Sequence, residues 1–171
     1  MNDNTVSYYA AGPAGLAARV ITLWALAGGF VLLAVVLMSA YSISASAVAG
    51  APFAGDFELV QMGVAVAAFC FLPYCQLTGA NVTADIFTAG APARVQAVLG
   101  LIASAVALGF AILILVQMWK GMFDYRKYAE TTAILQIPHW MAFIPILISL
   151  ALLALASALT LIAAWRDAGA R

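Results

Sequence analysis

A cluster of polar side chains lies in the short stretch YAETTAILQIPHW, which runs from Tyr128 to Trp140 between two long apolar segments. The stretch contains a carboxylate (Glu130), two hydroxyls and the only histidine of the chain, His139. A single imidazole excludes a haem held by two histidines. Cys70 and Cys75 lie about 140° apart on a helix, so they cannot bridge within it, and their spacing matches neither a zinc site nor a redox motif.

No catalytic motif accompanies these residues. The sequence contains no glycine-rich phosphate loop, no zinc motif and no nucleophile elbow. Pumps and transporters usually keep ionisable groups in the middle of the membrane, whereas Glu58 here lies only about one turn inside an apolar run. We therefore expect neither an enzyme nor a self-sufficient transporter, and no cofactor.

Four apolar runs must position the polar stretch. Only 8% of the residues are charged, against about 25% in a soluble domain, and the net charge of zero indicates no nucleic-acid partner. The uncharged runs are Val20–Gly55, Leu59–Ala84, Val95–Trp119 and, apart from the histidine, Thr131–Trp165. Because a spanning helix needs about 20 apolar residues, the sequence predicts an all-α integral membrane protein with four transmembrane helices.

The predicted spans cover about residues 20–48, 57–78, 95–118 and 138–165. They form a single domain, residues 19–167, between an N-terminal tail (1–18) and a C-terminal tail (168–171).

Two details of the predicted spans concern prolines and the connection before the fourth span. We expect Pro138 in the first turn of that span, which proline favours, and a kink at Pro73. Residues 119–137 combine charged and apolar side chains, which predicts a short interfacial amphipathic segment. Arg126 and Glu130 would pair if that segment is helical, since they lie four residues apart.

Small residues recur at helical spacing on two of the spans. In lipid, small residues allow helices to approach closely, so we interpret these as helix-packing positions; the alternative is that an alanine-rich chain produces such spacings by chance. The positions are Ser39, Ser42, Ser46 and Gly50 on the first span, and Gly100 and Ser104 on the third.

Basic residues near the span ends indicate the orientation. With the N-terminus inside, Arg19, Arg94, Arg166 and Arg171 lie on the inner side, and Lys120, Arg126 and Lys127 lie on the other. Because cytoplasmic loops carry the excess of Lys and Arg, this four-to-three count predicts that both termini are cytoplasmic. Trp140 is expected to anchor its span at the headgroup level.

The stretch between the third and fourth spans resembles a known family. Glu130-Thr131-Thr132, then Leu135-x-Ile137-Pro138-x-Trp140 and then Pro145, is similar to the small permease (Q) subunit of tripartite ATP-independent periplasmic transporters. That family shows Glu followed by Ser or Thr, then Leu-x-Ile-Pro-x-Trp. It also carries Gly-x-His and a later Asp after its second span; Gly79, Asn81 and Asp85 occupy those places here, with Asn81 replacing the histidine.

The resemblance implies a function in solute uptake. In that family a secreted substrate-binding protein delivers an organic acid to two membrane subunits. The large M subunit holds the substrate and sodium sites and moves as an elevator. The small subunit packs against M, widens its scaffold and anchors it in the bilayer.

By this resemblance the chain lies in the bacterial inner membrane. Its partners would be the large M permease, the periplasmic binding protein (transiently) and the lipid bilayer. It would serve sodium-coupled uptake of organic acids without binding substrate itself. Glu130, Thr131, Pro138 and Trp140 would structure the outer corner or contact a partner. Asn81 and Asp85, four residues apart, either contact a partner or form a solvated face.

Two alternatives stay open at this point. The first is a structural or anchor subunit of another membrane complex, such as a respiratory complex. The second is an autonomous small transporter.

Overall fold

The computed structural model describes residues 13–79 and 93–169. They form the helices α2 (Pro13–Ala49), α3 (Asp56–Thr78), α5 (Ala93–Lys127) and α6 (Trp140–Gly169). All four helices are long and apolar enough to cross a membrane. This confirms the predicted all-α architecture with four spans. Within these residues the only β-type pairing is one isolated bridge between Thr131 and Pro138.

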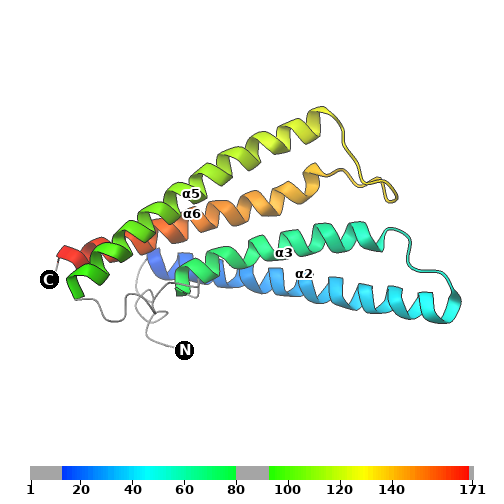
Figure 1. The fold of residues 1–171 in the computed structure, drawn as a ribbon, viewed down its shortest axis with the longest axis horizontal. Helices are drawn as coiled ribbons and strands as arrows, with labels where there is room; N and C mark the ends of the chain where they lie inside the picture. The colour runs from blue at the N-terminus through cyan, green and yellow to red at the C-terminus, as the bar shows by residue number, and fades with distance from the viewer. Residues whose placement is uncertain (1–12, 80–92, 170–171) are drawn as a thin grey trace.

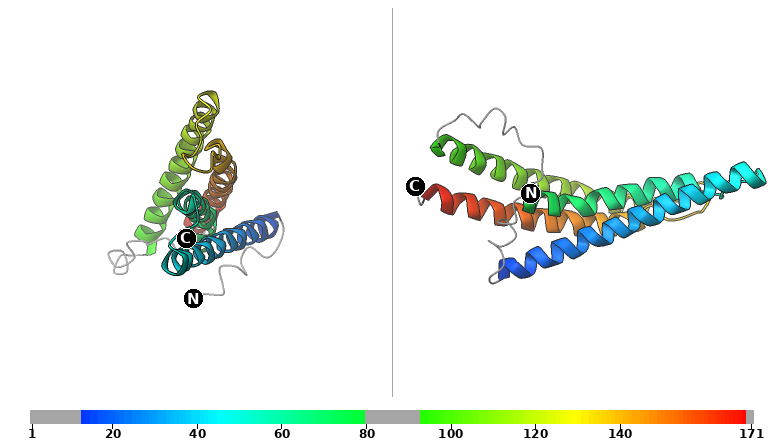
Figure 2. Two further views of the ribbon diagram at one scale, coloured as in Figure 1. Left: turned by 90° about the vertical axis from the view of Figure 1, so that its right-hand side faces the viewer. Right: turned by 90° about the horizontal axis from the view of Figure 1, so that it is seen from below.

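The helices lie in a row, in the order α2, α3, α6, α5 (Figure 1). α2 and α3 form one antiparallel hairpin, α5 and α6 form another, and the two hairpins meet along α3 and α6. Figure 2 shows that α2 and α5, the outer members, are inclined to each other. α2 begins and α6 ends at one end of the row, called here the terminal end. The α2–α3 and α5–α6 connections lie at the opposite end, called here the loop end (Figure 1).

The helix ends differ from the predicted spans. α2 begins at Pro13, so residues 13–18 are helical and not a tail; proline suits a first helical turn because its missing N–H would have no partner there. The prediction that Pro138 lies in the first turn of the last span is wrong. α6 begins at Trp140, and Pro138 precedes it, with its carbonyl accepting the Met141 N–H at 3.1 Å.

The connection between α5 and α6 also differs from the prediction. Residues 119–137 form no separate helix, because α5 continues to Lys127 and the residues after it are non-helical. Arg126 and Glu130 therefore do not share a helix, and the predicted helix pair is wrong. The Glu130 N–H instead reaches back to the Tyr125 carbonyl at 3.3 Å. That this segment lies in the membrane interface stays a prediction.

The interior of the row is tied together by a polar contact among three helices. Nε1 of Trp24 on α2 donates to Oγ of Ser149 on α6 at 2.8 Å, and that hydroxyl donates to the Pro145 carbonyl at 2.8 Å. Sγ of the buried Cys70 on α3 lies 3.6 Å from the same hydroxyl. Polar groups in an apolar interior need such partners, so this contact fixes how α2, α3 and α6 face one another. Cys70 and Cys75 are both free thiols, as their spacing implies.

Close helix packing occurs at glycines that the small-residue pattern did not single out. A Cβ added to Gly28 on α2 would collide with Cys70 on α3, and one added to Gly63 on α3 would collide with Val35 on α2. The two helices therefore approach each other through one glycine on each, as small residues permit.

The predicted helix-packing positions divide into three groups. Ser42 is buried, whereas Ser39 and Ser104 are only half-buried. Ser46, Gly50 and Gly100 are exposed on the surface of the chain. Contact of the exposed positions with another chain stays a prediction.

Candidate functional site

The polar stretch that opened the sequence analysis folds into an irregular hairpin at the loop end. We call residues 128–139 the corner hairpin. Its two arms meet where the Thr132 N–H donates to the Ile137 carbonyl (2.9 Å) and the His139 N–H donates to the Glu130 carbonyl (3.1 Å). The Thr132 hydroxyl accepts the Ile137 N–H at 3.0 Å. The polar residues of this stretch thus satisfy one another's backbone groups, which an irregular segment needs near a membrane.

A carboxylate from another helix fastens the tip of the corner hairpin. Oε1 of Glu58 accepts the Ile134 N–H at 2.7 Å, and its Oε2 accepts the Leu135 N–H at 3.0 Å. Glu58 lies in the first turn of α3. Hydrogen bonds to a charged acceptor are stronger than those between neutral groups, so this contact joins the α2–α3 hairpin to the α5–α6 hairpin.

The α2–α3 turn is held by a serine and an aspartate. Oγ of Ser42 donates to Oδ2 of Asp56 at 2.5 Å and accepts the Phe53 N–H at 3.2 Å. Ser42 is 1% exposed. This residue therefore fixes a connection between helices in addition to being a small packing residue.

Gly55 joins the two connections at the loop end. Its φ of +79° lies in the left-handed region, which glycine adopts without the steric cost of a Cβ. A Cβ at this position would also collide with the Leu135 side chain. The α2–α3 turn and the corner hairpin are thus in direct contact, and this contact requires a glycine.

Aromatic rings complete the base of the corner hairpin. The Tyr125 ring lies 5.2 Å from the Phe143 ring and 5.7 Å from the His139 ring, centroid to centroid. The Arg126 guanidinium lies 5.8 Å from the centre of the Trp140 ring, within the range of a cation–π interaction. These contacts hold the end of α5 against the start of α6.

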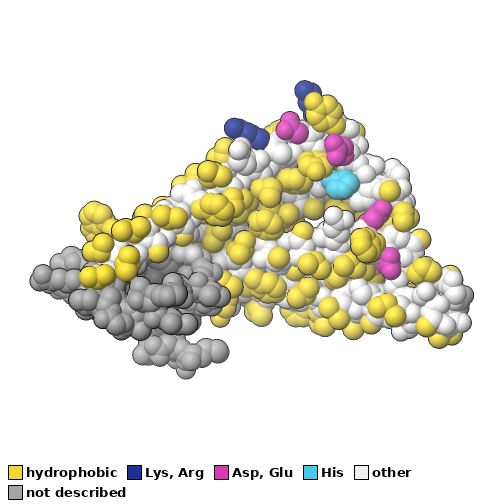
Figure 3. All heavy atoms as spheres, viewed as in Figure 1, with side chains coloured by type: hydrophobic (Ala, Val, Ile, Leu, Met, Phe, Trp, Pro, Cys, Tyr) yellow, Lys and Arg dark blue, Asp and Glu magenta, His cyan; other side chains and the backbone are white. Residues whose placement is uncertain are grey.

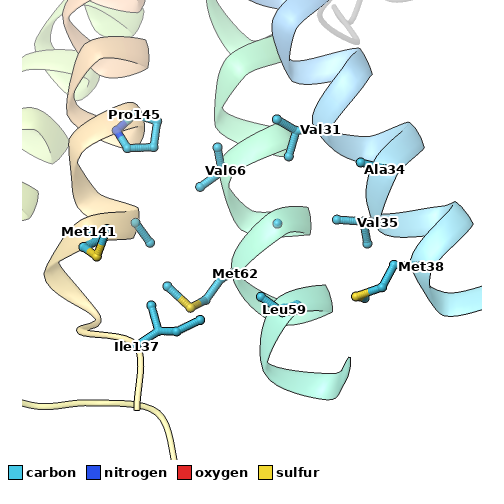
Figure 4. Close-up of a pocket in the computed structure, with 12 residues that line it drawn as sticks. Val31, Ala34, Val35, Met38, Leu59, Met62, Val66, Ile137, Met141 and Pro145 are labelled. Carbon is cyan, nitrogen blue, oxygen red and sulfur yellow. The ribbon is translucent and has the colours of Figure 1, made fainter. Parts of the chain in front are cut away.

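Two cavities lie beneath the corner hairpin. The larger, about 520 Å³, lies between α2, α3 and α6 and is lined by apolar side chains, including Met38, Met62 and Met141 (Figure 4). The second, about 340 Å³, lies between α3, α5 and α6, and we call it the polar cavity. Its polar lining consists of Glu58, Gln61, Tyr125, Thr131, Thr132 and His139.

No metal centre accompanies these cavities in the described part of the chain. Within residues 13–79 and 93–169, no three His, Cys, Asp or Glu side chains are grouped so that they could hold a metal ion. The polar side chains at the loop end accept hydrogen bonds from backbone N–H groups and so hold the connecting segments in place.

A comparison with protein families decides the identity of the chain at family level. The family described as tripartite ATP-independent periplasmic transporters, DctQ component, matches residues 35–167. The chain belongs to this family. It is the small permease component of such a transporter and a multi-pass membrane protein. Neither a search of curated proteins nor a search of solved structures found a match.

Membership in the DctQ family decides between the three functions left open by the sequence. The family is a family of transporter subunits, not of enzymes and not of respiratory anchors. Its members work with a large DctM permease and a binding protein. The resemblance drawn from the polar stretch is therefore confirmed.

The structure brings together four of the predicted site residues of this DctQ component. Glu130 and Thr131 lie on the first arm of the corner hairpin, Pro138 lies on the second arm, and Trp140 begins α6. The Glu130 carboxylate is exposed, and only its backbone takes part in the hairpin. Asn81 and Asp85 lie outside the described residues.

Sequence analysis missed Glu58, Gly55 and the polar role of Ser42. In the sequence, Glu58 is recognisable only as a charge near the start of a span. Its partners are backbone N–H groups, and no particular residue type in the sequence indicates them. A carboxylate one turn inside an otherwise apolar run was the available signal, since such a group needs partners.

Proposed function

We propose that this chain is the scaffold subunit that anchors the large permease of a sodium-coupled transporter for organic acids, and that it binds no substrate itself. The observation that carries this proposal is the arrangement of the helices in a row. A row has two broad faces, and all four of its helices carry large apolar side chains that are exposed on the surface of the chain. One face can then contact lipid while the other contacts a large membrane partner.

The placement of charge supports the scaffold role. In the space-filling view of Figure 3, hydrophobic side chains are spread along the described part of the face, and the charged side chains and histidine that are visible lie towards the loop end. The charged side chains of the described residues lie within eight residues of a helix end or in the corner hairpin. Ion and substrate sites in transporters use ionisable or broken-helix groups near mid-membrane, and such sites are expected on the large subunit.

The corner hairpin gives the scaffold a fixed shape. Glu58 and Gly55 connect the two helical hairpins at the loop end, and the Trp24–Ser149 hydrogen bond connects them further inside. A support that holds a moving partner must itself resist deformation, and these contacts serve that purpose.

We propose further that the chain lies in the bacterial inner membrane with both termini in the cytoplasm. The four-to-three basic count supports this orientation, as does the position of the start of α2 and the end of α6 at one end of the row (Figure 1). Reporter fusions after Arg171 and after Tyr125 should report opposite sides, with the Arg171 fusion cytoplasmic. A periplasmic signal from Arg171 would reverse the orientation.

Co-purification and uptake measurements test the scaffold role. The chain is expressed with the large permease subunit and the binding protein of its transporter, and reconstituted in liposomes with and without each partner. We expect the large subunit to co-purify with this chain and sodium-driven uptake of organic acids to require both. Coupled uptake by this chain alone would refute the scaffold role.

A further inference from the structure

The polar cavity beneath the corner hairpin lacks a partner for its charge. Glu58 contributes a carboxylate to its lining, and the donors that bind this carboxylate are neutral: the backbone N–H groups of residues 133–135 and the Thr132 hydroxyl. None of the described residues that line the cavity is a Lys or an Arg. Arg126 lies over the Trp140 ring, and Lys127 lies over the Tyr128 ring. The cavity therefore presents an anionic group without a cation from this chain.

The walls of the cavity suit the flat or alkyl part of a basic side chain. Tyr125 and Phe143 supply aromatic faces, and Met62 and Ile146 supply apolar surface. Aromatic faces attract Arg and Lys side chains through cation–π contacts, while the alkyl stems of these residues pack on apolar surface. A carboxylate and aromatic rings together form the chemistry that recognises a cation bearing N–H groups.

The helix macrodipoles at this cavity are weaker than the charge of Glu58. α3 and α6 begin beside the cavity and bring partial positive charge, whereas α5 ends there and brings partial negative charge. The three ends together leave roughly half a positive charge, so the full negative charge of the Glu58 carboxylate decides the local sign.

The depth of the cavity indicates a neighbour in the membrane. The lining extends from Glu58 to Ala65 on α3, which is about 10 Å at 1.5 Å per helical residue, and from Ala142 to Ile146 on α6, which is about 6 Å. The cavity thus runs alongside the spans, where a neighbouring membrane protein can reach it from the side. Figure 3 shows acidic side chains and the histidine together at the loop end of one broad face.

We propose that the polar cavity is a socket for a basic side chain, Arg or Lys, of the large permease subunit. This inference rests on the proposed function, which supplies the partner. The socket would set the position of that subunit along the row, because a charged group pairs at one place whereas apolar surfaces slide past each other with little preference.

Charge variants at Gln61 test the socket. Gln61 lines the cavity and is exposed, so Gln61→Lys places a competing cation at the socket and Gln61→Glu adds a second anion. Val48 is 90% exposed at the loop-end terminus of α2 and does not line the cavity, so Val48→Lys and Val48→Glu are the matched controls. The measurement is the ratio of large subunit to this chain after co-purification, together with the elution profile of each variant chain alone.

We expect Gln61→Lys to lower the ratio roughly tenfold or more, because like charges juxtaposed at an interface are strongly unfavourable. Gln61→Glu and both Val48 variants should keep the wild-type ratio. An equal loss with Gln61→Lys and Gln61→Glu would mean that shape and not charge is recognised, and an unchanged ratio with both would mean that no partner enters the cavity. Either result overturns the socket.

A photo-crosslinking residue at position 61 provides a readout that does not depend on the stability of a charge variant. Crosslinks should reach the large subunit within one helical turn of a Lys or Arg, and the same residue at position 48 should not reach that segment. Crosslinks to aminophospholipid, or to a segment without a basic residue, overturn the socket. If the wild-type chain fails to retain the large subunit at all, the proposed function fails and the socket fails with it.

Discussion

The Glu58 carboxylate accepts the backbone N–H of Leu135 at 3.0 Å, although 77 residues separate the two in the chain. With the neighbouring bond to Ile134, this contact fixes the tip of the corner hairpin on α3. The two helical hairpins of the row are thus joined at the loop end by one side chain.

Replacing Glu58 by Gln should loosen the corner hairpin. Gln offers one carbonyl oxygen in place of two carboxylate oxygens, and its NH2 group would face a backbone N–H. We expect faster hydrogen exchange at the Ile134 and Leu135 amides and a lower thermal midpoint of the purified subunit in detergent. Unchanged exchange at both amides would show that the carboxylate does not hold the hairpin.

Replacing Glu130 by Gln should behave differently from the Glu58 variant. The Glu130 side chain is exposed, and the residue takes part in the hairpin through hydrogen bonds of its backbone N–H and carbonyl. Surface substitutions of this kind usually change stability by no more than about 0.5 kcal/mol, so the isolated subunit should keep its thermal midpoint. If the carboxylate contacts the large subunit, the amount of assembled complex should fall while the apparent affinity for substrate stays near wild type. A loss of substrate affinity at constant subunit levels would instead place Glu130 in substrate delivery.

Replacing Gly55 by Ala should destabilise the subunit more than replacing Gly79 by Ala. Both glycines have positive φ, +79° and +64°, which costs an L-residue about 1–2 kcal/mol. A Cβ at Gly79 meets open space, whereas one at Gly55 meets the Leu135 side chain. In the double variant Gly55→Ala with Leu135→Ala, the part of the stability loss that comes from the steric clash should be recovered, while the part that comes from the positive φ should remain. Thermal unfolding in detergent compares these three variants with the wild-type chain, and equal effects of the two glycine variants would rule out the packing contact.

Replacing Ser42 by Ala should weaken the α2–α3 turn. The change removes the donor to Asp56 and the acceptor for the Phe53 N–H, and loss of such partners costs about 1–3 kcal/mol when the remaining groups stay buried. Ser44→Ala is the control, because Ser44 is exposed and its hydroxyl donates only to the Ala40 carbonyl in its own helix. A Ser44 variant as unstable as the Ser42 variant would argue against a special role of the turn.

Replacing Trp140 by Ala should separate the end of α5 from the start of α6. The change removes the ring beneath Arg126 and part of a half-buried apolar surface, worth together about 1–3 kcal/mol. Arg126→Gln removes only the cation and should cost less, about 0.5–1 kcal/mol. We also expect the indole to anchor the helix at the headgroup level, so Trp140→Ala should lower the amount of assembled complex more than Glu130→Gln does. The comparison requires quantifying both subunits in the membrane.

Much of this protein could be predicted from the order of residue types along the chain. The charge-free runs determined the membrane class and the presence of four spans, because hydrocarbon excludes charged groups wherever the chain crosses it. The run from Glu130 to Trp140 was sufficient to indicate the family, which the match over residues 35–167 confirms. Both results depend on composition or on the local order of residues, which can be read from a sequence without knowledge of the tertiary contacts.

The tertiary structure decided the partners of the polar groups. Glu58, Ser42 and Trp24 each have a partner that is distant in sequence or consists of backbone atoms, so the residue type alone does not reveal the pairing. The same holds for glycines: Gly28 and Gly63 face another helix closely, whereas Gly100 of the predicted stripe faces open space. Helical spacing shows which residues share a face of one helix, but the packing of the helices determines which face is covered. That packing depends on contacts between segments far apart in the chain, and only the folded row of helices brings them together.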